Sequence, residues 1–220
     1  MTANDTRERL LDAAERQFSE RGYDGASLRE ITQAAEANLA AVSYHFGSKE
    51  DLFVAVVARR VQPINLERLR LLDQAEAQAG ERPLEVEAIV EAMIAPVLRS
   101  GADGPCVLRM VGRANSESAA PTRRVVEGPM REIRARVRRA LRRALPHLNE
   151  RELSYRMHFT MGVVKSVASD QHLLHAISDG QCDPQDLDGT IAQLVPFLAA
   201  GMRAPSLERK RRASARSRRS

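Results

Sequence analysis

Apolar residues recur at helical spacing along almost the whole chain, and no stretch alternates strictly between apolar and polar residues as a half-buried strand would. In the first such stretch, apolar positions form one face from Asn4 to Arg21, where Gly22 follows as a stop signal. Further stripes cover residues 48–80, 83–98, 106–114, 130–148, 150–177 and 184–201. Together with two short helices between residues 27 and 46, the pattern predicts an all-α protein of about nine helices.

The two short helices are marked by residues typical of helix starts. Ser27 and Glu30 form an S-x-x-E capping box that predicts a helix beginning at Leu28. Asn38 is placed to cap a second helix from Leu39 to about Tyr44. The turn between them is about three residues long, which is the length found in a helix-turn-helix.

A third helix is expected immediately after this pair. Ser48 and Asp51 form an S-x-x-D box directly after Gly47. The helix that follows either runs on or kinks at Pro63, and its apolar stripe continues to Gly80. Two short helices and a long third one near the N-terminus predict a DNA-binding module attached to a larger part.

Residues 6–53 resemble the DNA-binding domain of the TetR family of transcriptional regulators. The matching strings are LLDAAERQFSERGYDGASLREI before the turn and YHFGSKEDLF after it. Three positions depart from the family pattern: Glu36 replaces a usual turn glycine, Leu39 a common lysine, and Ser43 a common tyrosine. The resemblance implies a ligand-responsive regulator, most often a repressor, that binds a palindromic operator as a homodimer. It also implies no enzymatic activity and no cofactor.

The expected organisation has three parts. Residues 1–52 form the helix-turn-helix domain, residues 53–202 a helical ligand-binding and dimerisation domain, and residues 203–220 a basic disordered tail. The tail holds eight Lys/Arg and one Glu, whereas residues 1–50 hold six Lys/Arg and nine Asp/Glu. The DNA-binding domain is therefore not a generally basic surface, and its affinity must come from a few well-placed groups or partly from the tail.

The second helix of such a motif enters the major groove, so its exposed residues are expected to meet bases. Leu39, Ala40 and Ala41 can pack on thymine methyl groups, or the alanines are simply small enough for the backbone to approach. Asn38 or Ser43 can add a polar base contact. The phosphate contacts are expected from the residues on either side of this helix, with a packing role as the alternative for His45. These residues are Ser27, Arg29, Tyr44, His45 and Lys49.

The middle of the chain is expected to hold an effector pocket, with ordinary core packing as the alternative. Methionines suit an irregular apolar pocket, and an arginine can meet an acidic head group. The residues expected to line it are Met93, Val97, Leu108, Arg109, Val111, Arg113, Phe159 and Met161. The segment Val61–Leu69 is similar to fatty-acid-responsive repressors, which implies a fatty acid or acyl-CoA effector.

The last two long helices are expected to pair with a second copy, because one helix-turn-helix makes few contacts. The candidate seam contains Leu153, Met157, Met161, Val164, Val167 and Ala168. The alternative is that these residues face the core of their own chain.

Other classes of function find less support. The sequence contains no H-E-x-x-H, no G-x-S-x-G, no phosphate-binding glycine loop and no Cys/His spacing typical of a metal site. There is no apolar run long enough for a membrane span and no secretory signal, so a cytoplasmic protein is expected. The remaining alternatives are a helical ligand-binding protein or enzyme with an incidental three-helix unit, and a nucleoid-type protein that binds DNA through its tail.

Overall fold

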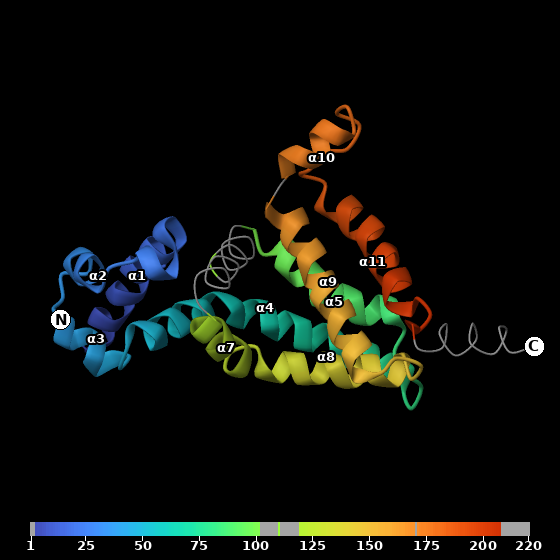
Figure 1. Ribbon diagram of the computed structural model, residues 1–220, viewed down its shortest axis with the longest axis horizontal. Coiled ribbons are helices and arrows are strands. Elements are labelled where there is room, and N and C mark those ends of the chain that lie inside the picture. The colour runs from blue at the N-terminus through green and yellow to red at the C-terminus, as the bar shows by residue number, and fades with distance from the viewer. Residues whose placement is uncertain (1–2, 102–109, 111–118, 170, 208–220) are drawn as a thin grey trace, which may run out of the picture. The chain divides into compact units, whose positions relative to one another are not determined.

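The computed structural model describes residues 3–101, 110, 119–169 and 171–207, and every regular element in these ranges is a helix (Figure 1). This confirms the all-α prediction. The helices are α1 (Ala3–Gly25), α2 (Leu28–Ala34), α3 (Leu39–His45), α4 (Lys49–Ala79), α5 (Val86–Arg99), α7 (Ala119–Glu127), α8 (Arg131–Ala144), α9 (Glu150–Ser169), α10 (Gln171–Ile177) and α11 (Leu187–Arg203).

The chain divides into two compact units. The first contains residues 1–66 and 100–132, and the second contains residues 67–99 and 133–220. Helix α4 therefore contributes residues to both units. The first unit is larger than the expected domain 1–52, because it also includes the start of α4 and all of α7.

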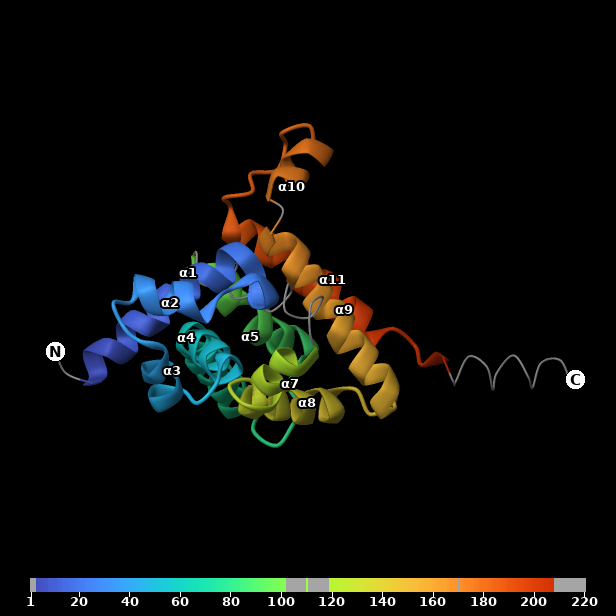
Figure 2. The same cartoon turned by 60° about the vertical axis from the view of Figure 1, so that its left-hand side comes forward.

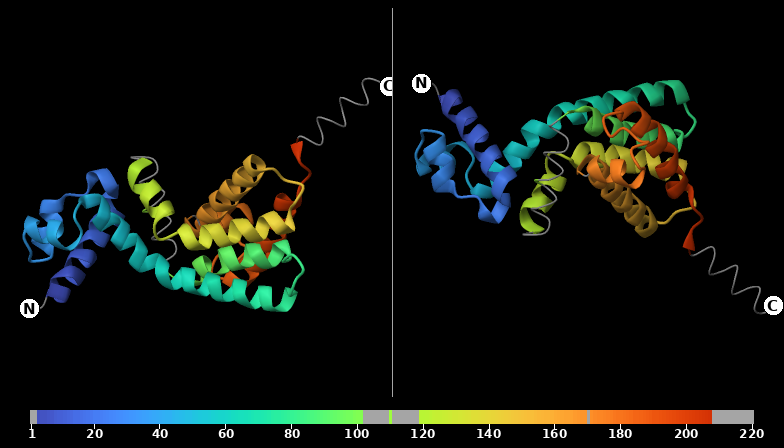
Figure 3. Two further views of the ribbon diagram at one scale, coloured as in Figure 1. Left: turned by 90° about the horizontal axis from the view of Figure 1, so that it is seen from below. Right: turned by 90° about the horizontal axis from the view of Figure 1, so that it is seen from above.

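In the first unit, α1, α2 and α3 lie together at the N-terminal end of α4 (Figure 3). Three rings pack among them: the Phe18 ring lies 5.1 Å from the Phe53 ring, and the Tyr23 ring lies 5.4 Å from that of Phe53. Met110 and Val125 belong to the same buried cluster, although they come from much later in the sequence. Burying such large apolar side chains stabilises the unit by roughly 1.5–3 kcal/mol each.

In the second unit, α11 packs against α5 and α9 (Figures 1 and 3). Helix α10 leads away from the ends of α9 and α11 (Figures 1 and 2). After α11 the chain remains packed: the guanidinium of Arg156 donates to the carbonyls of Met202 and Ala204, both at 2.6 Å, and Ser206 is 3% exposed. The packed part thus extends past residue 203, where a tail was expected, and residues 208–220 lie outside the described ranges.

Several helix starts differ from the sequence prediction. Helix α5 begins at Val86 instead of Pro83, and α11 begins at Leu187 instead of residue 184. In α11 the side chain of Asp186 accepts from the Gly189 N–H at 2.8 Å, so this residue caps the helix in place of the predicted Asp183-Pro184 start. Helix α7 was not predicted, because its start at Ala119 lies within a Ser- and Ala-rich stretch that reads as a loop.

Other parts of the helix pattern are confirmed. Helix α4 continues through Pro63, and α1 changes direction at Gly22, whose φ of 76° lies in the left-handed region that glycine tolerates. The predicted helix 150–177 occurs as α9 and α10, with residue 170 outside the described ranges. The predicted helix 106–114 also lies outside them, except for the buried Met110.

Candidate DNA-binding site and effector region

The turn between α2 and α3 depends on one residue in an unusual conformation and on one side-chain cap. Glu36 has a φ of 50°, so the turn accommodates a side chain where the resembled family uses glycine. The Asn38 side chain accepts from the Ala41 N–H at 2.9 Å and thereby caps α3, as predicted. Val42 is 2% exposed and anchors the inner face of α3, which fixes the direction in which the opposite face points.

The outer face of α3 is open to solvent in the way a recognition helix requires. Tyr44 is 80% exposed and Leu39 is 47% exposed, which is unusual for large apolar or aromatic side chains. Ala40 and Ser43 are also exposed, and Ala41 is half-buried. The surface offered to a groove is therefore mostly apolar and small, with hydroxyl groups at its C-terminal end.

The predicted capping box at α2 does not form. Ser27 occupies the N-cap position but makes no side-chain cap hydrogen bond. The Glu30 carboxylate instead accepts a hydrogen bond from Arg21 Nη1 at 2.6 Å. This ion pair joins α1 to α2 and uses the carboxylate that the capping box would need. The Ser27 hydroxyl is thus not consumed by the cap, and Arg29 beside it is exposed.

The start of α4 combines a cap with two pairs of opposite charges. The Ser48 hydroxyl donates to Asp51 Oδ2 at 2.6 Å and accepts from the Asp51 N–H at 3.0 Å, which confirms the predicted box. The Ser48 hydrogen bond, supported by Arg124, holds the pKa of Asp51 below its usual value. Arg124 of α7 pairs with Asp51 and also lies 3.7 Å from Glu50. This arginine therefore neutralises two carboxylates at the N-terminal end of α4.

Lys49 and His45 lie at the same end of α3 and are both half-buried. The Lys49 ammonium sits 4.8 Å from the centre of the Tyr23 ring and donates to the Asp24 carbonyl at 3.4 Å. The His45 ring lies 4.9 Å from the Tyr44 ring in an edge-to-face arrangement. Lys49 is thus held against the C-terminal end of α1, and His45 lies beside the exposed Tyr44 of α3. The sequence predicts phosphate contacts for both residues.

The predicted pocket residues are spread over different elements of the described chain. Met93 is half-buried and Val97 is 3% exposed, both on α5. Met161 is half-buried on α9, whereas Phe159 is 60% exposed, so one chain by itself does not enclose that ring. The other four predicted residues lie outside the described ranges: Leu108, Arg109, Val111 and Arg113. The pocket as a whole stays a prediction.

The sequence analysis missed a buried arginine beside these residues. Arg68 on α4 is 6% exposed, and its Nε donates to the Met93 carbonyl at 3.0 Å. Burial lowers the pKa of Arg68 to about 10, so the side chain still carries its charge at neutral pH. Spacing could have found it, because Arg68 lies four residues from both Ile64 and Leu72, and all three share the buried face of α4. The predicted stripe of this helix continued instead through Leu66, Leu69 and Leu72, of which Leu66 is 61% exposed.

Three of the six residues of the predicted dimer seam on α9 are buried within the chain itself, and Met157, Met161 and Val167 are half-buried. Leu153, Val164 and Ala168 are 2%, 1% and 9% exposed, because they face the core of the second unit. On α9 and α11 the large hydrophobic side chains that are exposed are aromatic. They are Tyr155 and Phe159 on α9 and Phe197 on α11, with exposures of 51%, 60% and 68%.

Within the described residues no helix is long and apolar enough to cross a membrane, and no group of three His, Cys, Asp or Glu side chains could hold a metal ion. The described geometry is that of a helix-turn-helix in the first unit and a helical second unit. Comparison with protein-family models agrees. Residues 10–56 match the family described as bacterial regulatory proteins, tetR family, and residues 87–201 match the Tetracyclin repressor-like C-terminal domain. The second match alone covers more than half of the chain, so this protein belongs to the TetR family.

The curated relatives align with only part of this chain. The HTH-type transcriptional repressor NicS of Pseudomonas putida is 35% identical over 83 residues, which cover 37% of this chain and 39% of NicS. This alignment therefore spans about two fifths of the length of that relative. Among solved structures, a mutant of the HlyIIR protein matches 88% of this chain and 97% of its own with a TM-score of 0.56 at 20% identity. The fatty acid degradation regulator FadR from Bacillus halodurans matches 90% of this chain and 96% of its own with a TM-score of 0.54 at 19% identity. These two likenesses show the shared fold.

Proposed function

We propose that this protein is a transcriptional repressor that binds a palindromic operator as a homodimer and releases it when a small apolar effector binds. The observation that carries the proposal is the open face of α3, capped by Asn38 and held by Val42, on a chain of the TetR family. Curated relatives of this chain, such as NicS of Pseudomonas putida, are named repressors. The family and the fold favour this over an enzyme with an incidental three-helix unit.

The proposed DNA contacts divide by chemistry. Leu39, Ala40 and Ala41 pack on thymine methyl groups in the major groove, and Asn38 and Ser43 supply polar base contacts. The phosphate contacts come from Ser27, Arg29, Tyr44, His45 and Lys49. The Asn38 side chain already accepts a bond from Ala41, so its amide N–H₂ is the part that a base or phosphate would meet.

The proposed dimer forms through the exposed aromatic residues of α9 and α11. Tyr155 and Phe159 lie one turn apart on α9, with ring centres 5.9 Å apart, and α11 packs beside α9 with Phe197 exposed. Aromatic residues are enriched in protein interfaces, and a two-fold pairing would cover both copies of this face at once. A Phe159→Ser/Phe197→Ser variant should therefore be monomeric at micromolar concentration, while Leu66→Ser removes an equally exposed apolar residue and should stay dimeric.

The proposed effector occupies the second unit near Met93, Val97 and Met161, and a fatty acid or acyl-CoA is the class we propose to test first. The class follows from the similarity of Val61–Leu69 to fatty-acid-responsive repressors, and Arg109 and Arg113 are the residues we propose for contact with its acid group. Binding would weaken DNA affinity only by the difference in effector affinity between the DNA-bound and DNA-free forms.

The test uses an operator obtained by selection and measures its affinity by fluorescence anisotropy. Decanoic acid and 1-decanol are added separately, since they share a chain length and differ in charge. We expect decanoic acid to weaken operator binding at least fivefold and the alcohol to have a smaller effect. If acyl compounds bind the protein yet leave its operator affinity unchanged, the proposed effector control is wrong.

A further inference from the structure

The charged residues at the start of α4 have a partner from far along the chain. Glu50 and Asp51 lie in the first turn of α4, directly after Lys49. Arg124 of α7 forms an ion pair with Asp51 and lies 3.7 Å from Glu50. All four residues belong to the first unit, although 73 positions separate Asp51 from Arg124.

The charge of the helix-turn-helix part makes this distant arginine relevant to DNA binding. Residues 1–50 hold six Lys/Arg and nine Asp/Glu, so acidic residues are in excess there. Lys49 is one of the proposed phosphate contacts, and Glu50 and Asp51 follow it in the chain. Their carboxylates therefore lie within roughly one Debye length, about 10 Å at 0.1 M salt, of DNA that contacts the start of α4.

Both carboxylates would repel a duplex if they had no cationic partner. The side chains of Glu50 and Asp51 are 29% and 34% exposed, so burial does not hide their charge. The Ser48 hydroxyl donates to Asp51 but is neutral, and it cancels no charge. The hydrogen bond to Asp51 holds the pKa of Arg124 above its usual value, so the arginine is charged at neutral pH. Arg124 is thus the group that compensates the two acids.

Helix α7 is held against α4 by contacts on the C-terminal side of Arg124. Val125, the next residue, is 2% exposed within the buried cluster of the first unit. The Gly128 N–H donates to the Arg124 carbonyl at 2.9 Å and closes the last turn of α7. The Asn65 side chain on α4 donates to the Pro129 carbonyl at 3.0 Å. Packing and backbone contacts therefore place Arg124 at the start of α4.

The ion pair itself contributes little to folding. The side chains of Arg124 and Asp51 are 42% and 34% exposed, and exposed ion pairs add little to stability. The burial of Val125 already fixes α7 in place. The charge of the carboxylates matters more for a ligand that arrives from solution with negative charges of its own, as DNA does.

We propose that Arg124 supports operator binding through Asp51 and Glu50, because it neutralises these carboxylates where DNA phosphates approach Lys49. The inference rests on the proposed operator binding and adds a residue outside the helix-turn-helix. Arg124 lies within residues 87–201, which match the C-terminal family model, whereas Asp51 lies within residues 10–56, which match the N-terminal model. Any displacement of α7 from α4 therefore lowers operator affinity.

The test measures operator affinity by fluorescence anisotropy at about 0.1 M salt, where the Debye length is about 10 Å. Arg124→Gln leaves both carboxylates without this partner. In water, one unit charge about 8 Å from a phosphate changes affinity roughly 2.3-fold, and a dimer has two DNA-binding domains, so we expect about a fivefold loss. Arg124→Lys keeps the charge and should stay within about twofold of the unmodified chain.

The matched control is Arg123→Gln, which removes the same charge from the neighbouring exposed position of α7. Adjacent residues point to different faces of a helix, so Arg123 does not share the direction of Arg124. Among the described residues, Arg123 forms no ion pair. The control should change operator affinity by less than about twofold.

A second substitution separates neutralisation from direct contact with DNA. Asp51→Asn removes one carboxylate, and its amide oxygen can still accept from the Ser48 hydroxyl. The Arg124→Gln/Asp51→Asn variant has the net charge of the unmodified chain and should bind the operator within about twofold of it. If it stays as weak as Arg124→Gln, Arg124 touches the DNA itself and the proposal is wrong.

Three other outcomes overturn the proposal. Arg124→Gln binds the operator as tightly as the unmodified chain, or Arg123→Gln loses as much affinity as Arg124→Gln. In the third, operator affinity falls in step with the free energy of unfolding in urea across the variants, which marks a purely structural role. Each of these leaves operator binding by the unmodified chain intact. An unmodified chain that binds no operator would overturn the proposed function and this inference together.

Discussion

Glu15 on α1 is the centre of an ion-pair cluster that joins α1 to α4 in the first unit. Its carboxylate accepts from Arg59 Nη2 at 2.7 Å and from Arg60 Nε at 2.8 Å, and its side chain is 12% exposed. Arg59 also pairs with the more exposed Asp12 at 2.8 Å. The two carboxylates therefore share one arginine at nearly equal distance and differ mainly in burial.

Replacing Glu15 by Gln should destabilise the packing of α1 on α4. A hydrogen bond to a charged group contributes about 1.5–3 kcal/mol, and Gln can keep hydrogen bonding to one of the two arginines while losing the charge. The side chains of Arg59 and Arg60 are 27% and 36% exposed, so solvent screening reduces what each hydrogen bond contributes to stability. We expect a loss of about 1–2 kcal/mol for Glu15→Gln, and at most about 0.5 kcal/mol for the control Asp12→Asn.

Native-state hydrogen exchange of the α1 amides measures this directly, because opening of α1 exposes them. A loss of about 1–2 kcal/mol lowers protection by roughly 5- to 30-fold. Asp12→Asn should lower protection about twofold or less. Equal effects of both substitutions would refute the reasoning, since burial would then not decide the strength of these pairs.

The same cluster predicts a dependence on pH. Burial alone would raise the pKa of Glu15, but hydrogen bonds and charge from Arg60 and Arg59 hold it below the usual 4.5. Because the folded pKa is the lower one, the unfolded chain takes up the proton first as the pH falls. The stabilisation is therefore fully present above about pH 5.5 and is lost progressively as the pH falls below about 4.5 and through the lowered pKa of folded Glu15. The Glu15→Gln variant should lack this part of the acid transition when stability is followed across that whole range.

Three further predictions concern the turn, the phosphate contacts and the interface. Glu36→Gly should raise the stability of the first unit by about 1 kcal/mol in urea unfolding, because it relieves a φ of 50° at a side-chain-bearing residue, and Glu36→Ala should bring no gain. Lys49→Gln should reduce the slope of log affinity against log salt for operator DNA by about one, and an unchanged slope would remove Lys49 from the phosphate contacts. Light scattering should show Phe159→Ser/Phe197→Ser as a monomer, and a dimer would place the interface elsewhere.

The caps explain why most of the DNA-binding module could be predicted from the sequence. Asn38 and the Ser48–Asp51 pair act locally, within three residues, so their positions specify the starts of α3 and α4. Ser27 looks the same in sequence but makes no cap bond. Its expected partner Glu30 pairs with Arg21 on another helix, and that long-range contact leaves no local sequence signal.

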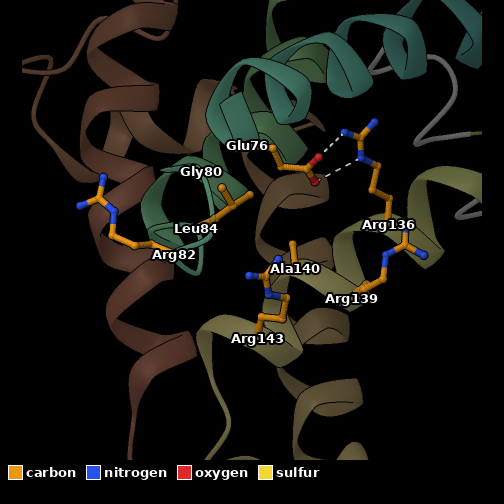
Figure 4. A pocket seen from close by; sticks show the side chains of 8 residues that line it. All are labelled: Glu76, Gly80, Arg82, Leu84, Arg136, Arg139, Ala140 and Arg143. Carbon is orange, nitrogen blue, oxygen red and sulfur yellow. Dashed lines mark hydrogen bonds and ion pairs between the residues drawn. The ribbon is translucent and has the colours of Figure 1, made fainter. Parts of the chain in front are cut away.

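The second unit was harder to predict, because the features that matter there depend on packing. The apolar residues Leu153 and Val164 could equally face a partner or their own core, and only the fold shows that they are buried. Arg68 lies four residues from the buried Ile64 and Leu72, so its position in the helix indicates burial. A charged side chain, however, normally predicts exposure. A cavity beside α8 is lined by residues of α4, of the loop after it and of α8, and the sequence alone does not bring these segments together (Figure 4).

The central claim is that α3 enters a major groove and that a symmetric pair of chains places two copies of it on one operator. Selection of bound duplexes from a random DNA pool by the full chain tests this most directly. The account predicts an enriched motif with two-fold symmetry, whose half-sites lie about one helical turn or more apart, and a Leu39→Arg variant that changes the selected bases. Enrichment of a single unrepeated site, or no enrichment over the starting pool, would contradict it.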